Sequence, residues 1–137
     1  MTTTYTTQLG NTRKFDDLVE DIFQSAATDQ VLSAYSMENG KAVSDFLDKN
    51  RNLIQYLEIA PAKIKEYFGG KVARLSLKVM YDPEVEPEYD HGTLFINVSS
   101  KGSLKSLMAK LDSLTWEWLL KIPAKDRLYF EVDLDFA

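Results

Sequence analysis

Residues 79–92, VMYDPEVEPEYDHG, hold the densest set of groups in the chain that are capable of chemistry. The segment contains five carboxylates together with the only histidine, His91. Carboxylate oxygens suit hard cations, and a metal ion activates water for hydrolysis. Asp82, Glu84 and His91 are therefore the candidate ligands of a metal-dependent hydrolase.

The spacing within this segment argues against a metal site. A calcium-binding EF-hand loop needs glycine at its sixth position and glutamate at its twelfth, and here those positions hold Pro87 and Thr93. Proline also favours extended backbone, which separates neighbouring carboxylates. We therefore predict a solvated, extended connection between two strands, with no bound metal or other cofactor.

Other arrangements able to do catalysis are weakly supported. The chain has no cysteine, no G-x-S-x-G nucleophile turn and no glycine-rich phosphate loop. Glu131, Asp133 and Asp135 alternate along a predicted strand, so their side chains share one face, where paired carboxylates can act as acid and base. A charged solvent face balanced by Arg74 and Lys78 is the favoured interpretation, and we predict no catalytic residues.

Composition indicates one folded domain rather than a disordered chain. The 137 residues are 45% hydrophobic and 27% charged, with a formal net charge of −5. Acids and bases are spread evenly along the sequence, which argues against a nucleic-acid partner. The chain shows neither a secretory signal pattern nor an apolar run of membrane-spanning length, so we expect a cytoplasmic protein that does not enter a membrane.

The first half of the chain is predicted to be helical. Residues 1–12 are expected to form a loose arm or an edge strand, and a helical part follows over residues 13–69. Its first helix covers residues 15–26, and two or three short helices, broken near Gly40 and Asn50, cover residues 29–58. A further helix is expected to begin at Pro61, since proline suits the first helical position.

The period of apolar residues changes from 3.6 to 2 at Gly70, which predicts a β-β-α-β arrangement over residues 70–137. Its strands are expected at 71–81, 93–99 and 127–136, with the strongest helix at 103–122. The first of these strands is placed between the other two. The fold class is thus α+β, a single domain over residues 1–137, with N-terminal helices packed on a mainly antiparallel sheet of three or more strands.

Three apolar residues fall outside the predicted buried faces. Trp116 and Leu120 project away from the apolar stripe of the helix at 103–122, and Phe95 lies on the outer phase of its strand. Two interpretations stay open for them. They pack against the N-terminal helices, or they form an interface with a protein partner or a second copy of the chain.

Residues from about Ile64 to Phe136 resemble a family of small uncharacterised prokaryotic proteins. The shared pieces are Tyr67-Phe68-Gly69, Asp82-Pro83-Glu84, Leu94-Phe95-Ile96 and the segment from Trp116 to Trp118. The family has an acidic run before its tryptophan where this chain has Leu114-Thr115. The resemblance implies a small bacterial accessory protein and brings no activity or catalytic residues with it.

Taken together, these features favour a non-enzymatic protein-interaction or accessory module that binds another protein or itself. The acidic composition suits a basic partner, such as a nuclease toxin. Two alternatives remain. One is the carboxylate-based metal-dependent hydrolase, and the other is a small-ligand-binding protein with a pocket between the helical half and the sheet.

Overall fold

The computed structural model describes residues 28–135 of the chain. Its contacts divide the chain into two units, Met1–Ser33 and Ala34–Ala137, and each is described by itself. In the first unit, residues 28–32 are helical, and the backbone N–H of Ser33 donates to the carbonyl of Asp29 at 3.0 Å. The predicted N-terminal arm and the helix predicted at 15–26 lie outside the described residues.

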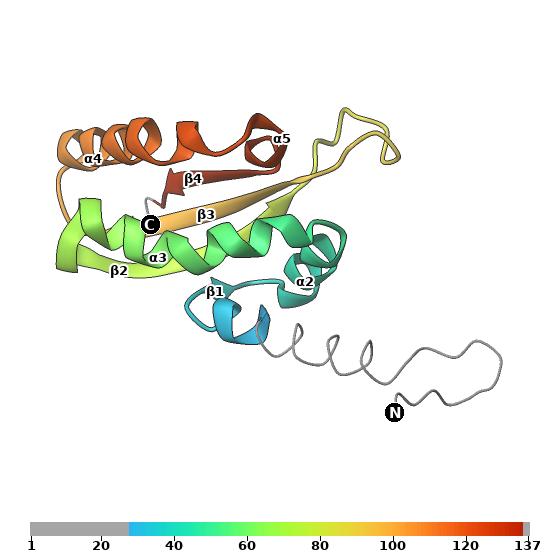
Figure 1. Ribbon diagram of the computed structural model, residues 1–137, viewed down its shortest axis with the longest axis horizontal. Helices are drawn as coiled ribbons and strands as arrows, with labels where there is room; N and C mark the ends of the chain where they lie inside the picture. The colour runs from blue at the N-terminus through green and yellow to red at the C-terminus, as the bar shows by residue number, and fades with distance from the viewer. Residues whose placement is uncertain (1–27, 136–137) are drawn as a thin grey trace, which may run out of the picture. The chain divides into compact units, whose positions relative to one another are not determined.

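The second unit contains a four-stranded sheet in the order β1-β2-β3-β4 (Figure 1). The strands are β1 (Ser36–Met37), β2 (Val72–Met80), β3 (Thr93–Ser100) and β4 (Phe130–Leu134). β1 and β2 are parallel, β2 and β3 are antiparallel, and β3 and β4 are parallel. The α+β class is confirmed, but the sheet is mixed, so the prediction of a mainly antiparallel sheet is wrong.

The predicted strand order is also wrong, because β3 and not β2 lies between the other two long strands. One edge of β2 is already occupied by β1, a two-residue strand too short to be seen as a periodic pattern. The chain leaving β3 therefore returns through a helical crossover and adds β4 to the remaining edge of β3.

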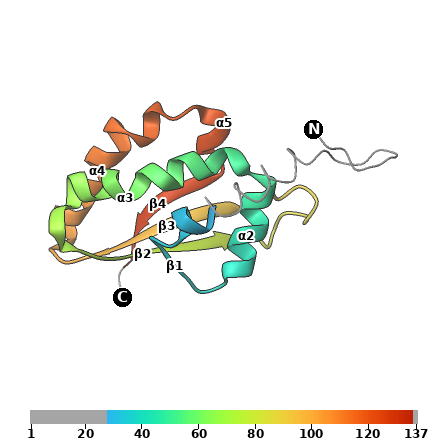
Figure 2. The ribbon, with the colours of Figure 1, turned by 60° about the horizontal axis from the view of Figure 1, so that its bottom comes forward.

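Helices occur in both halves of the second unit rather than only in its N-terminal part. They are α2 (Gly40–Lys49), η1 (Arg51–Leu53), α3 (Ile54–Phe68), η2 (Gly69–Lys71), α4 (Leu104–Glu117), η3 (Leu119–Lys121) and α5 (Ala124–Arg127). Figure 2 shows α3 and α4 on the same face of the sheet. The core between these layers contains side chains exposed by 1% or less, among them Leu57, Ile64, Phe68, Leu77, Leu94, Ile96, Val98 and Leu114.

The predicted breaks near Gly40 and Asn50 are confirmed at the two ends of α2. Before the helix, the side chain of Asn39 accepts a hydrogen bond from the backbone N–H of Ala42 at 3.1 Å. After it, the Asn50 side chain donates to the carbonyl of Phe46 at 2.9 Å. Asparagine side chains thus satisfy backbone groups that the short helix leaves without an internal partner.

Pro61 lies inside α3 and does not begin it, contrary to the sequence-based prediction. Proline lacks the N–H that would bond to the carbonyl four residues earlier, which here belongs to Leu57. The hydroxyl of Tyr35 donates to that carbonyl instead, at 2.7 Å, in a buried position. Burial also raises the pKa of Tyr35, so the hydroxyl keeps its proton and remains a donor. This contact satisfies the carbonyl that the proline leaves without an intrahelical donor.

Candidate interaction surface

The acidic segment joins β2 to β3, as predicted, but its prolines do not hold it extended. The backbone N–H of Val85 donates to the Asp82 carbonyl at 3.2 Å, and that of Tyr89 donates to the Glu86 carbonyl at 2.8 Å. Each bond closes a four-residue turn with proline at its second position, where the fixed proline φ angle is favoured. The connection is therefore a pair of consecutive turns.

Two carboxylates of this connection accept hydrogen bonds from its own backbone. Asp82 accepts from the backbone N–H of Glu84 at 2.9 Å, and Asp90 accepts from Gly92 at 3.0 Å and from Asp82. These are the local bonds expected of aspartate in turns. The presence of Asp82 and Asp90 is therefore explained by backbone hydrogen bonds, without any ligand.

The His91 side chain contacts Tyr129 and Gly92 rather than the other two candidate metal ligands. Its ring lies 4.4 Å from the ring of Tyr129, centroid to centroid, and its Nδ1 atom lies 2.6 Å from the carbonyl oxygen of Gly92. Within residues 28–135, no three histidine, aspartate or glutamate side chains come together in a way that would hold a metal ion. Asp82, Glu84 and His91 therefore form no ligand set.

The face of the sheet opposite α3 and α4 is polar. Arg74 and Asp135 approach to 3.4 Å, and the hydroxyl of Ser99 donates to the same carboxylate at 3.1 Å. Glu131 and Asp133, the other acids of this face, are exposed. The side chains lie as expected for a charged solvent face, and the Arg74 pair supplies part of the predicted charge balance.

Several hollows border the sheet, and two of them bear on ligand binding. One, of about 470 Å³, lies on the polar face and is lined by Ser36, Met37, Glu38, Arg74, Ser76, Leu77, Lys78, Asn97 and Asp135. The other, of about 340 Å³, lies between α3 and β2 near Gly69 and Leu75, where the small-ligand interpretation places a pocket. Because Arg74 and Asp135 in the larger hollow are already paired with each other, a ligand there would have to compete with that pair.

Asp126 is a buried carboxylate that the sequence analysis missed. It is 5% exposed, and it accepts hydrogen bonds at 2.6 Å from both the Tyr56 hydroxyl and the Asn52 amide. The Tyr56 hydrogen bond lowers the pKa of Asp126 below its ordinary value, and Asn52 adds to this effect while burial opposes it. These bonds join α5 to η1 and to the beginning of α3. A four-residue helix has too few residues for a periodic pattern to reveal its buried face.

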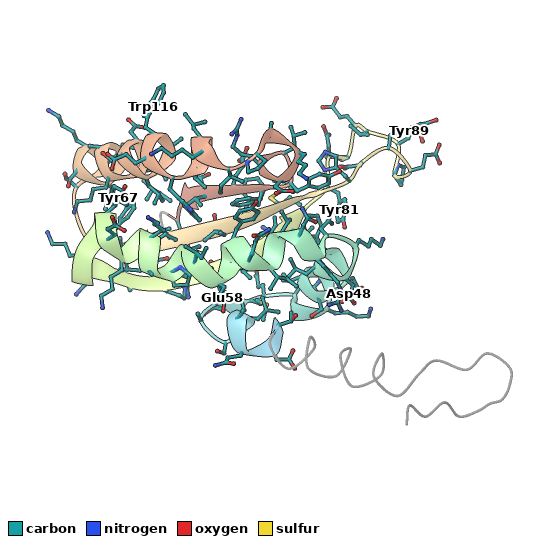
Figure 3. The ribbon with its side chains drawn as sticks, viewed as in Figure 1. Asp48, Glu58, Tyr67, Tyr81, Tyr89 and Trp116 are labelled. Atoms are coloured by element: carbon teal, nitrogen blue, oxygen red, sulfur yellow. The ribbon has the colours of Figure 1, made fainter. Side chains whose placement is uncertain are left out.

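Helix α4 presents Trp116 outward. Its N-terminus is fixed by Ser103, whose hydroxyl accepts from the Ser106 backbone N–H at 3.2 Å, and it buries Leu107 and Leu114 toward the sheet. Trp116 lies on the opposite side of the helix and is 72% exposed, pointing away from the sheet (Figure 3). Leu120, in the following η3 turn, is 43% exposed. Packing within the described part of the second unit therefore leaves both residues exposed, and the helix predicted at 15–26 lies outside the described residues.

The predicted interaction residues do not form one surface. Phe95 is half-buried on the polar face of the sheet, with Lys78 and Glu131 as its neighbours on β2 and β4. Trp116 lies on α4 and Leu120 in η3 directly after it, and α4 covers the other face (Figure 2). The candidate interaction surface is therefore the exposed side of α4, and Phe95 is separate from it.

A hydrogen bond between helices fixes α4 relative to α3. The hydroxyl of Tyr67 on α3 donates to the Glu117 carboxylate at 2.7 Å, close to Trp116 in sequence. The same bond raises the pKa of Tyr67 to about 12. Trp116 thus projects from a helix that packs on the sheet through Leu107 and Leu114 and is joined to α3 by this bond.

Comparisons of the chain with models of known protein families, with curated proteins and with solved structures found no match. The resemblance to small prokaryotic proteins therefore stays a prediction. Across residues 28–135, the helices are all too short or too polar to cross a membrane.

Proposed function

We propose that this protein is a non-enzymatic accessory module of the cytoplasm that binds another protein, or a second copy of itself, through the exposed side of α4. The observation that carries the proposal is the 72% exposure of Trp116 on a well-anchored helix. Tryptophan is enriched among the residues that dominate binding energy at interfaces, because burying its large ring removes much apolar surface from water.

Neighbouring residues support the same surface. Leu120 is 43% exposed and follows Trp116 in the η3 turn. Leu104 and Met108, near the other end of α4, are 59% and 44% exposed. Large apolar side chains are thus exposed along α4 and η3, and a partner that covers them removes apolar surface from water.

Small-ligand binding is a second candidate, supported by the hollow of about 340 Å³ between α3 and β2, where a pocket is predicted. The hydrolase alternative has weaker support, because its candidate ligands do not converge. Calorimetric titration with magnesium, manganese and calcium tests the hydrolase directly, and we expect no heat of binding.

Site-specific photo-crosslinking tests the proposed function. A benzophenone amino acid is placed at Trp116 in cells that naturally produce the protein, and the matched control carries it at Glu58, an exposed residue of α3. We expect one adduct of defined mass from position 116 and none from position 58. Equal adducts from both positions, or no adduct from position 116, would contradict the proposal.

A further inference from the structure

The exposed side of α4 carries a regular pattern of residues. Lys105, Ala109, Asp112 and Trp116 are all exposed, and their spacing of four, three and four residues places them in one line along the helix. We name this line the outward stripe. It has a cation near the N-terminal end, an anion past the middle and an aromatic ring near the C-terminal end.

The charges of α4 oppose its own dipole. Lys105 lies in the first turn, which contains no acid, and the last turn contains no base and ends at Glu117. A cation near a helix N-terminus and an anion near its C-terminus both interact unfavourably with the helix dipole. In α2 and α3, by contrast, the last turns hold Lys49 and Lys65, which is the favourable arrangement.

Neither charged residue of the outward stripe is compensated within the described structure. Lys105 and Asp112 make no ion pair or hydrogen bond with residues 28–135. They are seven residues apart, about 10 Å along the helix axis, so they are too far apart to pair with each other. An unfavourable arrangement of charges is expected where a partner supplies the compensation.

A second α4 in antiparallel orientation supplies that compensation. If a two-fold axis crosses the stripe between Met108 and Ala109, the Lys105 of each copy faces the Asp112 of the other, and two ion pairs form. Small side chains let helices approach closely, and Ala109 lies at the crossing point. A two-fold axis requires a surface that is complementary to itself, and the outward stripe satisfies this requirement.

The position of Trp116 fits the same arrangement. In this register, Trp116 of one copy lies opposite Lys101 of the other, just before α4 begins at Leu104. Lys101 is exposed, and a cation over a tryptophan ring is favourable. The association that pairs the charges therefore also covers Trp116.

We infer that the outward stripe of α4 is a homodimer interface, in which two copies of the chain pair their α4 helices antiparallel. The inference rests on the proposed function and identifies the partner as a second copy. A single helix pair buries less area than a standard interface, so the dimer is expected to be weak and concentration-dependent.

Charge exchange tests the inference. Sedimentation equilibrium of the full chain over micromolar concentrations is expected to show a monomer–dimer equilibrium. Lys105→Asp and Asp112→Lys, each alone, place like charges opposite each other and should weaken the dimer by about tenfold or more. An equal mixture of the two variants should recover dimers, because each copy then complements the other.

Glu58→Lys is the matched control, since it changes the net charge as Asp112→Lys does but lies on α3, and it should leave the equilibrium unchanged. Circular dichroism confirms that each variant is folded. A wild-type chain that stays monomeric, or a mixture that does not associate, would overturn the homodimer. If a different protein is then crosslinked at position 116, the proposed function stands without the homodimer, whereas the absence of any adduct removes both.

Discussion

The two faces of the sheet are formed by the same strands but differ in what covers them. Along β3, the side chains toward α3 and α4 are fully buried: Leu94, Ile96 and Val98. The side chains between them, Phe95, Asn97 and Ser99, face the polar side and are only partly buried. Burial of one face therefore specifies the fold. On the other face, each exposed polar contact contributes little to the free energy of unfolding.

The largest expected effect tests the covered face. Ile96→Ala removes a fully buried side chain and should lower the free energy of unfolding by about 2–5 kcal/mol, through lost burial and the remaining cavity. Urea denaturation measures it. Phe95→Ala, one residue earlier on the polar face, is the matched control and should lower it by less than half as much. An equal loss from both would show that both faces are packed in solution.

The next effect concerns α3, which covers the buried face. Tyr35→Phe leaves the Leu57 carbonyl without its hydrogen bond, and an unsatisfied buried acceptor costs about 1–3 kcal/mol. Pro61→Ala supplies a backbone N–H for the same carbonyl. We therefore expect the stability lost in Tyr35→Phe to be smaller when Pro61 is replaced as well, as a double-mutant cycle by urea denaturation would show. Additive effects would mean that the two residues act independently.

A smaller effect is expected from replacing Asp126, the single buried charged residue among those described. The pKa of Asp126 is lowered in the folded protein, so its carboxylate stabilises the fold above its ordinary pKa of about 3.9, and this stabilisation is lost as pH falls through the lowered value. Asp126→Asn should reduce the melting temperature at pH 7, and the difference from wild type should shrink at acidic pH. Glu58→Gln is the control, because this side chain of α3 is exposed and makes no hydrogen bond within residues 28–135.

The smallest effect is expected on the polar face. Arg74→Ala removes the ion pair with Asp135, whose side chains are 54% and 33% exposed. Exposed pairs contribute about 0–1 kcal/mol and are screened by salt. The variant should therefore unfold close to the wild-type urea midpoint, and the small difference should disappear in high salt. A loss comparable with that of Ile96→Ala would remove the distinction between the two faces.

Periodicity located the elements that bury one face. The alternation in β3 and β4 and the stripe of α4 repeat often enough to define an apolar side, and β3 lies where the sequence predicts it. The strand predicted at 127–136 begins only at Phe130, because residues 124–127 form α5, and the helix predicted at 103–122 ends at Glu117. Trp116 and Leu120 were also identified in this way, since both depart from an otherwise consistent stripe. Their exposure depends on how the second unit packs, and a local sequence pattern does not predict that packing.

The features missed by the sequence analysis depend on contacts between distant residues or on turn geometry. The prediction for Pro61 failed because its structural partner, Tyr35, is remote in sequence. The prediction of extended backbone at the prolines of the β2–β3 connection fails because turns and extended backbone both accept the proline φ angle. The role of Asp126 rests on Tyr56 and Asn52, each about 70 residues earlier.

The bond from Tyr35 to α3 also bears on how the molecule opens. Because Pro61 removes one backbone hydrogen bond from inside α3, the Leu57 carbonyl has a donor only while Tyr35 stays in place. Local detachment of the short segment before α2 would expose the Leu57 carbonyl and loosen the helix at the same time. Amide hydrogen exchange should therefore show the β1 segment and the middle of α3 opening together, as one cooperative unit.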